Sequence, residues 1–189
     1  MSGIYSLSAH LFWIVPLVLL IAYLFSPRFR GDIAQTRVRR ILAGGLEKSR
    51  YTVLNDLVIP AGGGTVRIDH VVVSKSGIFV IASQYASGWV SGAEVQDRWK
   101  QRHLGRSRQF DNPMHRNQLQ REALQELLGI PSSKTIPVVV MVGQKGFKTR
   151  MPHNLIQPEK QLWILTWLII RLAFLPNLLH VHSHQNRIF

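Results

Sequence analysis

The chain has 189 residues, 46% of them apolar, which is enough for one folded domain with an attached segment. The 23 Lys and Arg against 10 Asp and Glu give a formal net charge of +13, which favours a polyanionic partner, either nucleic acid or an anionic lipid surface. Basic residues that only solubilise the chain or orient a membrane segment explain the same excess. Cysteine is absent, which excludes disulfides, cysteine-based zinc sites and a thiol nucleophile.

The amino-terminal stretch from Ile4 to Phe25 contains no Lys, Arg, Asp or Glu. A membrane-spanning helix needs about 20 mostly apolar residues, and Pro16 is tolerable inside one. No basic residue precedes this stretch, whereas five arginines follow it closely: Arg28, Arg30, Arg37, Arg39 and Arg40. We therefore predict a transmembrane helix at residues 4–25, with the amino terminus outside and the rest of a single-pass protein cytoplasmic. A cleaved signal peptide and a buried soluble helix are the alternatives.

The next segments alternate between helix and strand patterns. Apolar residues at helical spacing predict a helix that ends at Gly44 and Gly45, and they are Ile33, Ala34, Val38, Ile41 and Leu42. Residues 51–60 read as a strand, and the glycines of 61–64 as a hairpin turn rather than a phosphate loop, because no Lys-Ser/Thr follows. Residues 65–74 and 77–83 are two further strands, whose Val and Ile content predicts a central sheet buried on both faces.

A basic connection then leads to a second predicted helix, with Asn112 as its N-cap, Pro113 in its first turn and Gly129 at its end. Its expected apolar face consists of Ala123, Leu124, Leu127 and Leu128. A buried strand follows at 135–143, so the fold class is a mixed α/β sandwich. Residues 161–175 are short for a membrane span and contain Arg171, which favours a core or membrane-surface helix.

One acid on the central strands raises the question of metal chemistry. Metal-dependent phosphodiester cleavage uses a few carboxylates around Mg²⁺ and benefits from a Lys. An acid on one strand and an acid-x-Lys on the next supply these groups, because alternate strand residues share a face. Asp69 is such a first acid, but the next strand carries Ala82 and Gln84 at the two matching positions.

Several segments, in this order, resemble the NERD (nuclease-related) domain, a branch of the PD-(D/E)xK group: "GDIAQ", "YTVLNDLVIP", "IDHVVVSKSGIFVI", "GWVSG", "RW", "FDNP" and "PVVVMVG". The resemblance covers roughly residues 31–145, with an apolar helix and polar tail at 146–189 behind it. It implies a restriction-endonuclease-like mixed sheet flanked by helices, and such domains often follow an amino-terminal membrane segment, as the transmembrane helix predicted here.

The same resemblance implies four charged site positions, of which only Asp69 keeps its charge. Gln35 stands at the acid of the first helix, and Ala82 and Gln84 stand at the acid-x-Lys. We take Asp69, Gln84 and Gln35 as the candidate catalytic residues and Asp69 as the metal ligand, for Mg²⁺ or Mn²⁺ if the chain is active. One carboxylate holds Mg²⁺ poorly, so we expect a degraded nuclease centre, a pseudoenzyme.

Two other interpretations of this centre stay open. An active Mg²⁺- or Mn²⁺-dependent DNA endonuclease needs substitute acids, for which Asp32, Glu94 and Asp97 are candidates. In the other interpretation, Asp69 only forms a structural ion pair, with Arg67 close by in the sequence.

The basic connection is the candidate nucleic-acid-binding surface, with DNA favoured over RNA, and its cations are Arg98, Lys100, Arg102, Arg106 and Arg108. If its start is extended, the first three share one face and Trp99 lies on the other, where it packs in the core or stacks on a base. A membrane-tethered interaction scaffold lying on anionic lipid is the non-enzymatic rival. In the tail, His180, His182 and His184 have a spacing that fits a metal site, although a mobile polar tail is the ordinary explanation.

Overall fold

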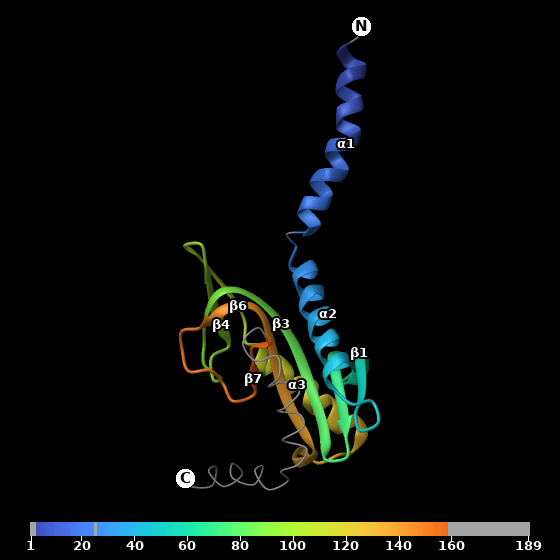
Figure 1. The fold of residues 1–189 in the computed structure, drawn as a ribbon, viewed down its shortest axis with the longest axis vertical. Helices are drawn as coiled ribbons and strands as arrows, with labels where there is room; N and C mark the ends of the chain where they lie inside the picture. Colours follow the sequence, from blue (N-terminus) through green and yellow to red (C-terminus); the bar gives the residue numbers. More distant parts are fainter. Residues whose placement is uncertain (1–2, 25, 159–189) are drawn as a thin grey trace.

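The computed structural model describes residues 3–24 and 26–158. The expectations for residues 161–175 and for the histidines of the tail lie outside these residues. Helix α1 (Gly3–Leu24) leads away from the rest of the structure, and α2 (Pro27–Gly45) lies against the sheet (Figure 1). The Ser26 side chain accepts a hydrogen bond from the Phe29 N–H and so caps α2 at the start.

The amino-terminal helix exposes its apolar side chains from Trp13 to Leu24. Across the described residues, no helix by itself has the length and apolar character to cross a membrane. Trp13–Leu24 and Phe29–Gly45 meet those criteria only as a pair, bent by 55°. The transmembrane helix therefore stays a prediction.

The described strands form one mixed sheet. They are β1 (Thr52–Ala61), β2 (Gly64–Ser74), β3 (Gly77–Ser91), β4 (Arg98–His103), β5 (Arg106–Asp111), β6 (Thr135–Phe147) and β7 (Leu155–Ile156). Strands β1 to β5 are antiparallel neighbours in sequence order, whereas β6 pairs in parallel with β3 and β7 in parallel with β6. The predicted strands and turns before residue 84 are confirmed, but the basic connection is itself a hairpin, β4–β5.

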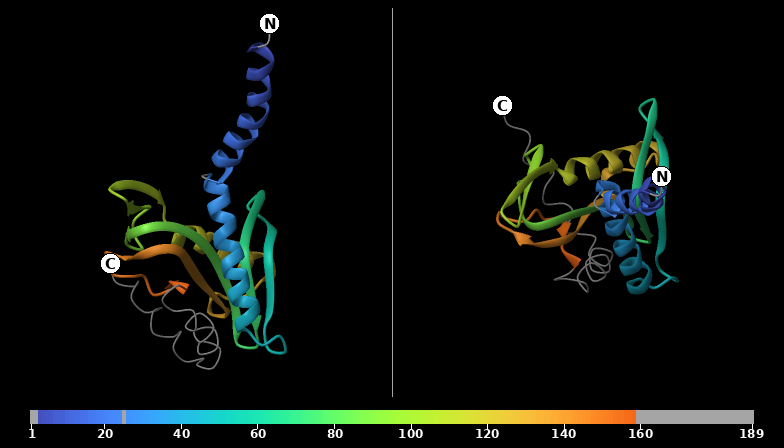
Figure 2. Two further views of the ribbon diagram at one scale, coloured as in Figure 1. Left: turned by 45° about the horizontal axis from the view of Figure 1, so that its top comes forward. Right: turned by 90° about the horizontal axis from the view of Figure 1, so that it is seen from above.

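Helices cover the two faces of this sheet (Figure 2), which confirms the mixed α/β class. On one face, Ala34, Val38 and Leu42 of α2 pack against β2, β3 and β6. Predicted Ile33 of the same helix is 38% exposed instead, because it lies off the buried stripe. On the opposite face, α3 (Pro113–Leu128) packs against β1, β2, β3 and β6. The 3-10 turn η1 (Ser132–Lys134) joins α3 to β6.

The caps of α3 are as predicted, but its buried face is not. Asn112 caps the first turn, and Gly129 ends the helix with φ +61°. Leu127 and Leu128 are about half exposed, so their assignment to the apolar face is wrong. Two amides take the buried places instead: Asn117 donates to Val80 O at 3.0 Å and Gln120 to Arg67 O at 2.8 Å. These bonds let polar side chains be buried against strand carbonyl groups.

Candidate functional site

A gap in the sheet creates the site. One edge of β3 pairs with β6, while the other edge pairs with β2 over residues 77–81 and with β4 over residues 89–91. Between these two ladders, at residues 82–88, no described strand pairs with that edge. The strand bends here: the register against β6 shifts at Gly88, whose φ is +72°. A Cβ at Gly88 would collide with the carbonyl oxygen of Arg102, so this close approach needs glycine.

Side chains satisfy the peptide groups that the gap leaves without a strand partner. Asp69 Oδ2 accepts a hydrogen bond from the Ser83 N–H at 2.7 Å, and Arg116 Nη2 donates to Ser83 O at 2.9 Å. The two side chains thus do for Ser83 what a neighbouring strand would do.

Two amides extend the same arrangement along the strand. Gln101 Oε1 accepts from the Ser87 N–H at 3.2 Å, and Gln84 Nε2 donates to Tyr85 O at 2.9 Å. Residues 83, 85 and 87 alternate, so their peptide groups face the same edge of β3. The polar residues at the gap therefore have a structural role, which is to satisfy the peptide groups at the open edge of β3.

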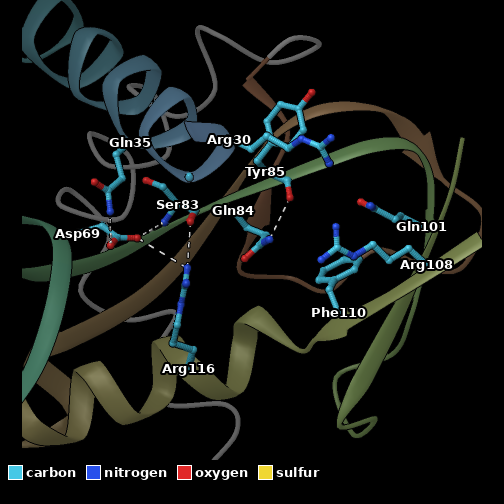
Figure 3. A pocket seen from close by; sticks show the side chains of 11 residues that line it. Arg30, Gln35, Asp69, Ser83, Gln84, Tyr85, Gln101, Arg108, Phe110 and Arg116 are labelled. Carbon is cyan, nitrogen blue, oxygen red and sulfur yellow. Dashed lines mark hydrogen bonds and ion pairs between the residues drawn. The ribbon is translucent and has the colours of Figure 1, made fainter. Parts of the chain in front are cut away.

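Asp69 is 7% exposed, and both of its oxygens are engaged. Figure 3 shows Gln35 reaching it from α2 and Arg116 from α3. Its Oδ1 accepts from Gln35 Nε2 at 2.9 Å, and its Oδ2 lies 3.7 Å from Arg116 Nη2. The ion pair expected with Arg67 is wrong, because the Arg67 guanidinium donates to Asp56 Oδ1 at 2.6 Å and to Gln35 Oε1 at 3.4 Å rather than to Asp69. The structural partner of Asp69 comes from a helix 47 residues further along the chain.

A cavity of about 240 Å³ lies over the gap. Its lining includes all three candidate catalytic residues, Gln35, Asp69 and Gln84, which the fold therefore brings together. Ala82, the fourth position of the implied site, is fully buried in the apolar cluster around Trp99 and does not line the cavity. Whether the three lining residues act in catalysis stays a prediction.

The cavity is rich in cations. Arg30 of α2, Arg108 of β5 and Arg116 of α3 line it, and Asp69 is the single carboxylate among its described lining residues. Sequence reasoning found Arg108 but missed Arg30 and Arg116 as site residues. No local pattern marks Arg116 among the 23 basic residues, because only the packing of α3 across β3 brings it to Asp69.

The substitute acids lie elsewhere. Asp32 lines a separate pocket beside Tyr23 and Phe29. Glu94 lines a pocket near Arg150, and Asp97 faces His115 at 3.7 Å between Oδ1 and Nδ1. None of the three acids contributes to the cavity at Asp69.

Strands β4 and β5 divide the predicted nucleic-acid-binding residues between two faces. Directly paired residues share a face, and the register pairs Trp99 with Phe110 and Gln101 with Arg108. Arg98, Lys100 and Arg102 alternate with these and lie on the outer face, as expected for an extended segment. All five cations, Arg106 and Arg108 included, are exposed.

Trp99 anchors this hairpin and belongs to the core. It is fully buried, its Nε1 donates to Ala93 O at 2.9 Å, and its ring meets Phe110 and Phe147 edge to face. Of the two interpretations of Trp99, core packing is therefore correct, and stacking on a base is excluded by its burial.

His70 follows Asp69 on β2 and is 2% exposed. Its Nδ1 lies 2.7 Å from Asn55 Oδ1. Burial lowers the pKa of His70 below its ordinary 6.5, against the opposing effect of the neighbouring Asp69 carboxylate. The imidazole is therefore neutral at pH 7.

Sequence comparison identifies the domain that carries this site. Residues 30–142 match the family model of the nuclease-related domain, NERD. The chain belongs to the NERD family. An uncharacterized protein of Bacillus anthracis is 32% identical over 102 residues, which cover 54% of this chain and 48% of that protein. The chain thus spans about half the length of the curated relative it matches. No solved structure matches.

The NERD assignment implies a metal ion, but the residues at Asp69 do not fit one. Mg²⁺ takes oxygen ligands and is usually held through one or two carboxylates whose oxygens are free to ligate it, together with water and substrate phosphate oxygens. Here both Asp69 oxygens already accept hydrogen bonds, and a guanidinium lies 3.7 Å from Oδ2. Among the described residues, no three His, Asp or Glu side chains gather as a metal site. The arrangement is therefore a carboxylate paired with the Arg116 guanidinium and not a metal centre.

Proposed function

We propose that this chain is a membrane-anchored NERD protein that binds nucleic acid through the β4–β5 hairpin and does not cleave it with a metal ion. The observation that carries the proposal is the hairpin itself. It exposes Lys100, Arg102, Arg106 and Arg108, none of which forms an ion pair within the described residues. Arg98 alone has an acidic neighbour, Asp111 at 3.7 Å. Cations without acidic partners bind phosphates and release counterions on binding.

The shape of the hairpin favours DNA over RNA. The major groove of B-DNA admits a two-stranded ribbon, whereas the major groove of A-form RNA is too deep and narrow for side chains to read. The outer face of the ribbon, with Lys100 and Arg102, and its turn, with Arg106, are exposed to such a groove, whereas Trp99 and Phe110 hold the inner face against the core. Phosphate contacts carry no sequence information of their own, so we expect the salt-dependent part of the binding, which these cations supply, to be independent of sequence.

Anchoring through α1 places this domain at the cytoplasmic face of a membrane. The support is the basic segment that follows α1, which has five arginines between residues 28 and 40. The exposure of the apolar side chains of α1 supports it as well, since lipid would cover them.

The salt dependence of DNA binding by the full chain in detergent micelles tests the proposal. If the four unpaired cations each neutralise one phosphate, the slope of log K against log salt is about −3.6 for duplex DNA. The Lys100→Ala/Arg102→Ala double variant should reduce the slope by about 1.8. The control Lys75→Ala/Lys134→Ala removes two exposed cations at the other end of the sheet. An affinity that is the same at low and high salt, or equal slopes in both double variants, refutes hairpin binding.

A second candidate function is contact with anionic lipid, and the hairpin turn favours it. Leu104 is 86% exposed there, at φ +47°, between basic residues. The turn points toward the same end of the structure as α1 (Figure 1). An apolar tip flanked by Lys and Arg is suited to an anionic bilayer surface, where each cation contributes about 1 kcal/mol.

The absence of cysteine makes the lipid candidate easy to test. Leu104→Cys gives a single labelling site for an environment-sensitive dye in the full chain, reconstituted in nanodiscs with or without anionic lipid. The control site is Val95→Cys, which is 89% exposed outside the hairpin. A blue shift at position 104 alone, in anionic nanodiscs alone, supports lipid contact, and equal spectra in both lipids exclude it.

A further inference from the structure

We propose that the cavity at Asp69 holds the terminal phosphate of a nucleic-acid strand, with guanidinium groups in the role that a metal ion would otherwise take. This inference rests on the proposed function, because it gives that function a particular ligand: a strand end rather than the duplex backbone alone. It concerns the cavity between the β2 and β4 ladders and not the outer face of the hairpin.

The charge of the cavity is the first argument. Arg30, Arg108 and Arg116 reach it from three different elements (Figure 3). The side chains of Arg30 and Arg108 make no hydrogen bond or ion pair within the described part of the chain. Arg116 donates a hydrogen bond from Nη2 to Ser83 O. The one carboxylate, Asp69, is already satisfied by Gln35 and Ser83. The lining therefore carries an excess of two positive charges.

This excess matches a phosphate monoester better than a phosphodiester. A monoester carries about −1.5 to −2 charges at pH 7, whereas each internal phosphate of a strand carries one. Guanidinium groups bind phosphate oxygens with paired, charge-assisted hydrogen bonds. Three of them around one cavity suit a group with three free oxygens, which only a strand end offers.

The size and the walls of the cavity fit a nucleotide end. Its volume of about 240 Å³ lies below the roughly 300–1,000 Å³ typical of sites for drug-sized ligands. Phe110 of β5 lines the cavity beside Arg108, where its ring would offer a terminal base an apolar surface. Arg108 belongs to both the cavity and the hairpin, so a strand held on the hairpin has a continuous basic path to the cavity.

The test compares strands that differ only at their ends. Full-length protein in detergent micelles is titrated into internally labelled oligonucleotides that carry a 5′-phosphate, a 3′-phosphate or only hydroxyl ends. We expect one of the two phosphorylated strands to bind at least about tenfold more tightly than the hydroxyl strand, as charge-assisted hydrogen bonds imply. Inorganic phosphate should compete with this gain and leave the hydroxyl strand unaffected.

Arg30→Ala should abolish the preference and hardly change the affinity for the hydroxyl strand, because Arg30 has no described partner whose loss would disturb the fold. Arg40→Ala removes an exposed arginine from the same helix, outside the cavity, and should keep the preference. Equal binding of all three strands overturns the inference and leaves the proposed function intact, whereas failure to bind any strand overturns both. Inorganic phosphate that binds as tightly as the phosphorylated strand overturns the strand end as the source of the ligand.

Discussion

Replacing Asp69 by alanine tests whether its carboxylate has a structural or a catalytic role. The Asp69 carboxylate links three elements of the fold. It accepts hydrogen bonds from Gln35 of α2 at 2.9 Å and from the Ser83 N–H of β3 at 2.7 Å, and it lies 3.7 Å from the Arg116 guanidinium of α3. The Asp69→Ala variant removes the acceptor for both donors at once. It also leaves the edge of β3 open at the gap in the sheet.

The expected cost follows from these contacts. A buried donor without an acceptor costs about 1–3 kcal/mol, and the Ser83 N–H is buried. Gln35 is only partly buried and can turn toward water, so its loss lies near the lower end of that range. Arg116 has a side chain that is 49% exposed, and a solvated guanidinium adds little. Together these terms predict a loss of about 3 kcal/mol in the free energy of unfolding.

Denaturant unfolding of the full chain in detergent, followed by tryptophan fluorescence, measures this loss. The matched control is Asp111→Ala, which removes a carboxylate that is 94% exposed and 3.7 Å from Arg98. The control should change stability by no more than about 0.5 kcal/mol. If Asp69→Ala is as stable as the wild type or more stable, the claim that Asp69 stabilises the fold is refuted. Asp69 would then be a group kept at the expense of stability, as catalytic residues often are.

Further predictions concern the core, the bend of β3 and pH. Trp99→Ala should cost about 3–5 kcal/mol, whereas Trp89→Ala, at a side chain 44% exposed, should cost clearly less in the same unfolding assay; equal losses would contradict the core assignment. Gly88→Ala should give little folded protein on size-exclusion chromatography, because its Cβ meets the Arg102 backbone. Gly44→Ala has open space around its Cβ and should stabilise α2 by up to about 1 kcal/mol. A well-folded Gly88→Ala would mean that the bend is built differently. The lowered pKa of His70 means that the unfolded chain binds this proton more readily, so stability should fall as the pH drops below about 6.5. His70→Asn should flatten that slope in unfolding curves at pH 5 to 7, and an unchanged slope assigns the pH dependence to other groups.

Local signals in the sequence predict much of this fold. Asn112 and Gly129 mark the ends of α3 because a cap and a left-handed residue act within one helical turn. The turns at residues 61–64 and 75–77 are read the same way. Such signals do not predict the β4–β5 hairpin, since its sequence is mostly exposed and basic with only Trp99 and Phe110 as apolar anchors. Pairing with the far end of β3 makes this segment a strand.

The candidate site shows the same division between local and distant information. The family resemblance singled out Gln35, Asp69 and Gln84, and the structure places all three around one cavity. The resemblance does not indicate Arg30 or Arg116, because their positions depend on how two helices pack across opposite faces of the sheet. The sequence alone shows that acids are missing from this site, whereas only the folded structure shows which cations surround it.

The central claim is that this NERD domain holds nucleic acid without cutting it, and plasmid nicking tests it most directly. Supercoiled plasmid is incubated with purified full-length protein in Mg²⁺, in Mn²⁺ and in EDTA, beside the Asp69→Ala variant. The account predicts that the plasmid stays supercoiled in every lane while a mobility shift reports binding by the wild type. Nicking that requires Mn²⁺ or Mg²⁺ in the wild type and disappears in a folded Asp69→Ala variant would contradict it.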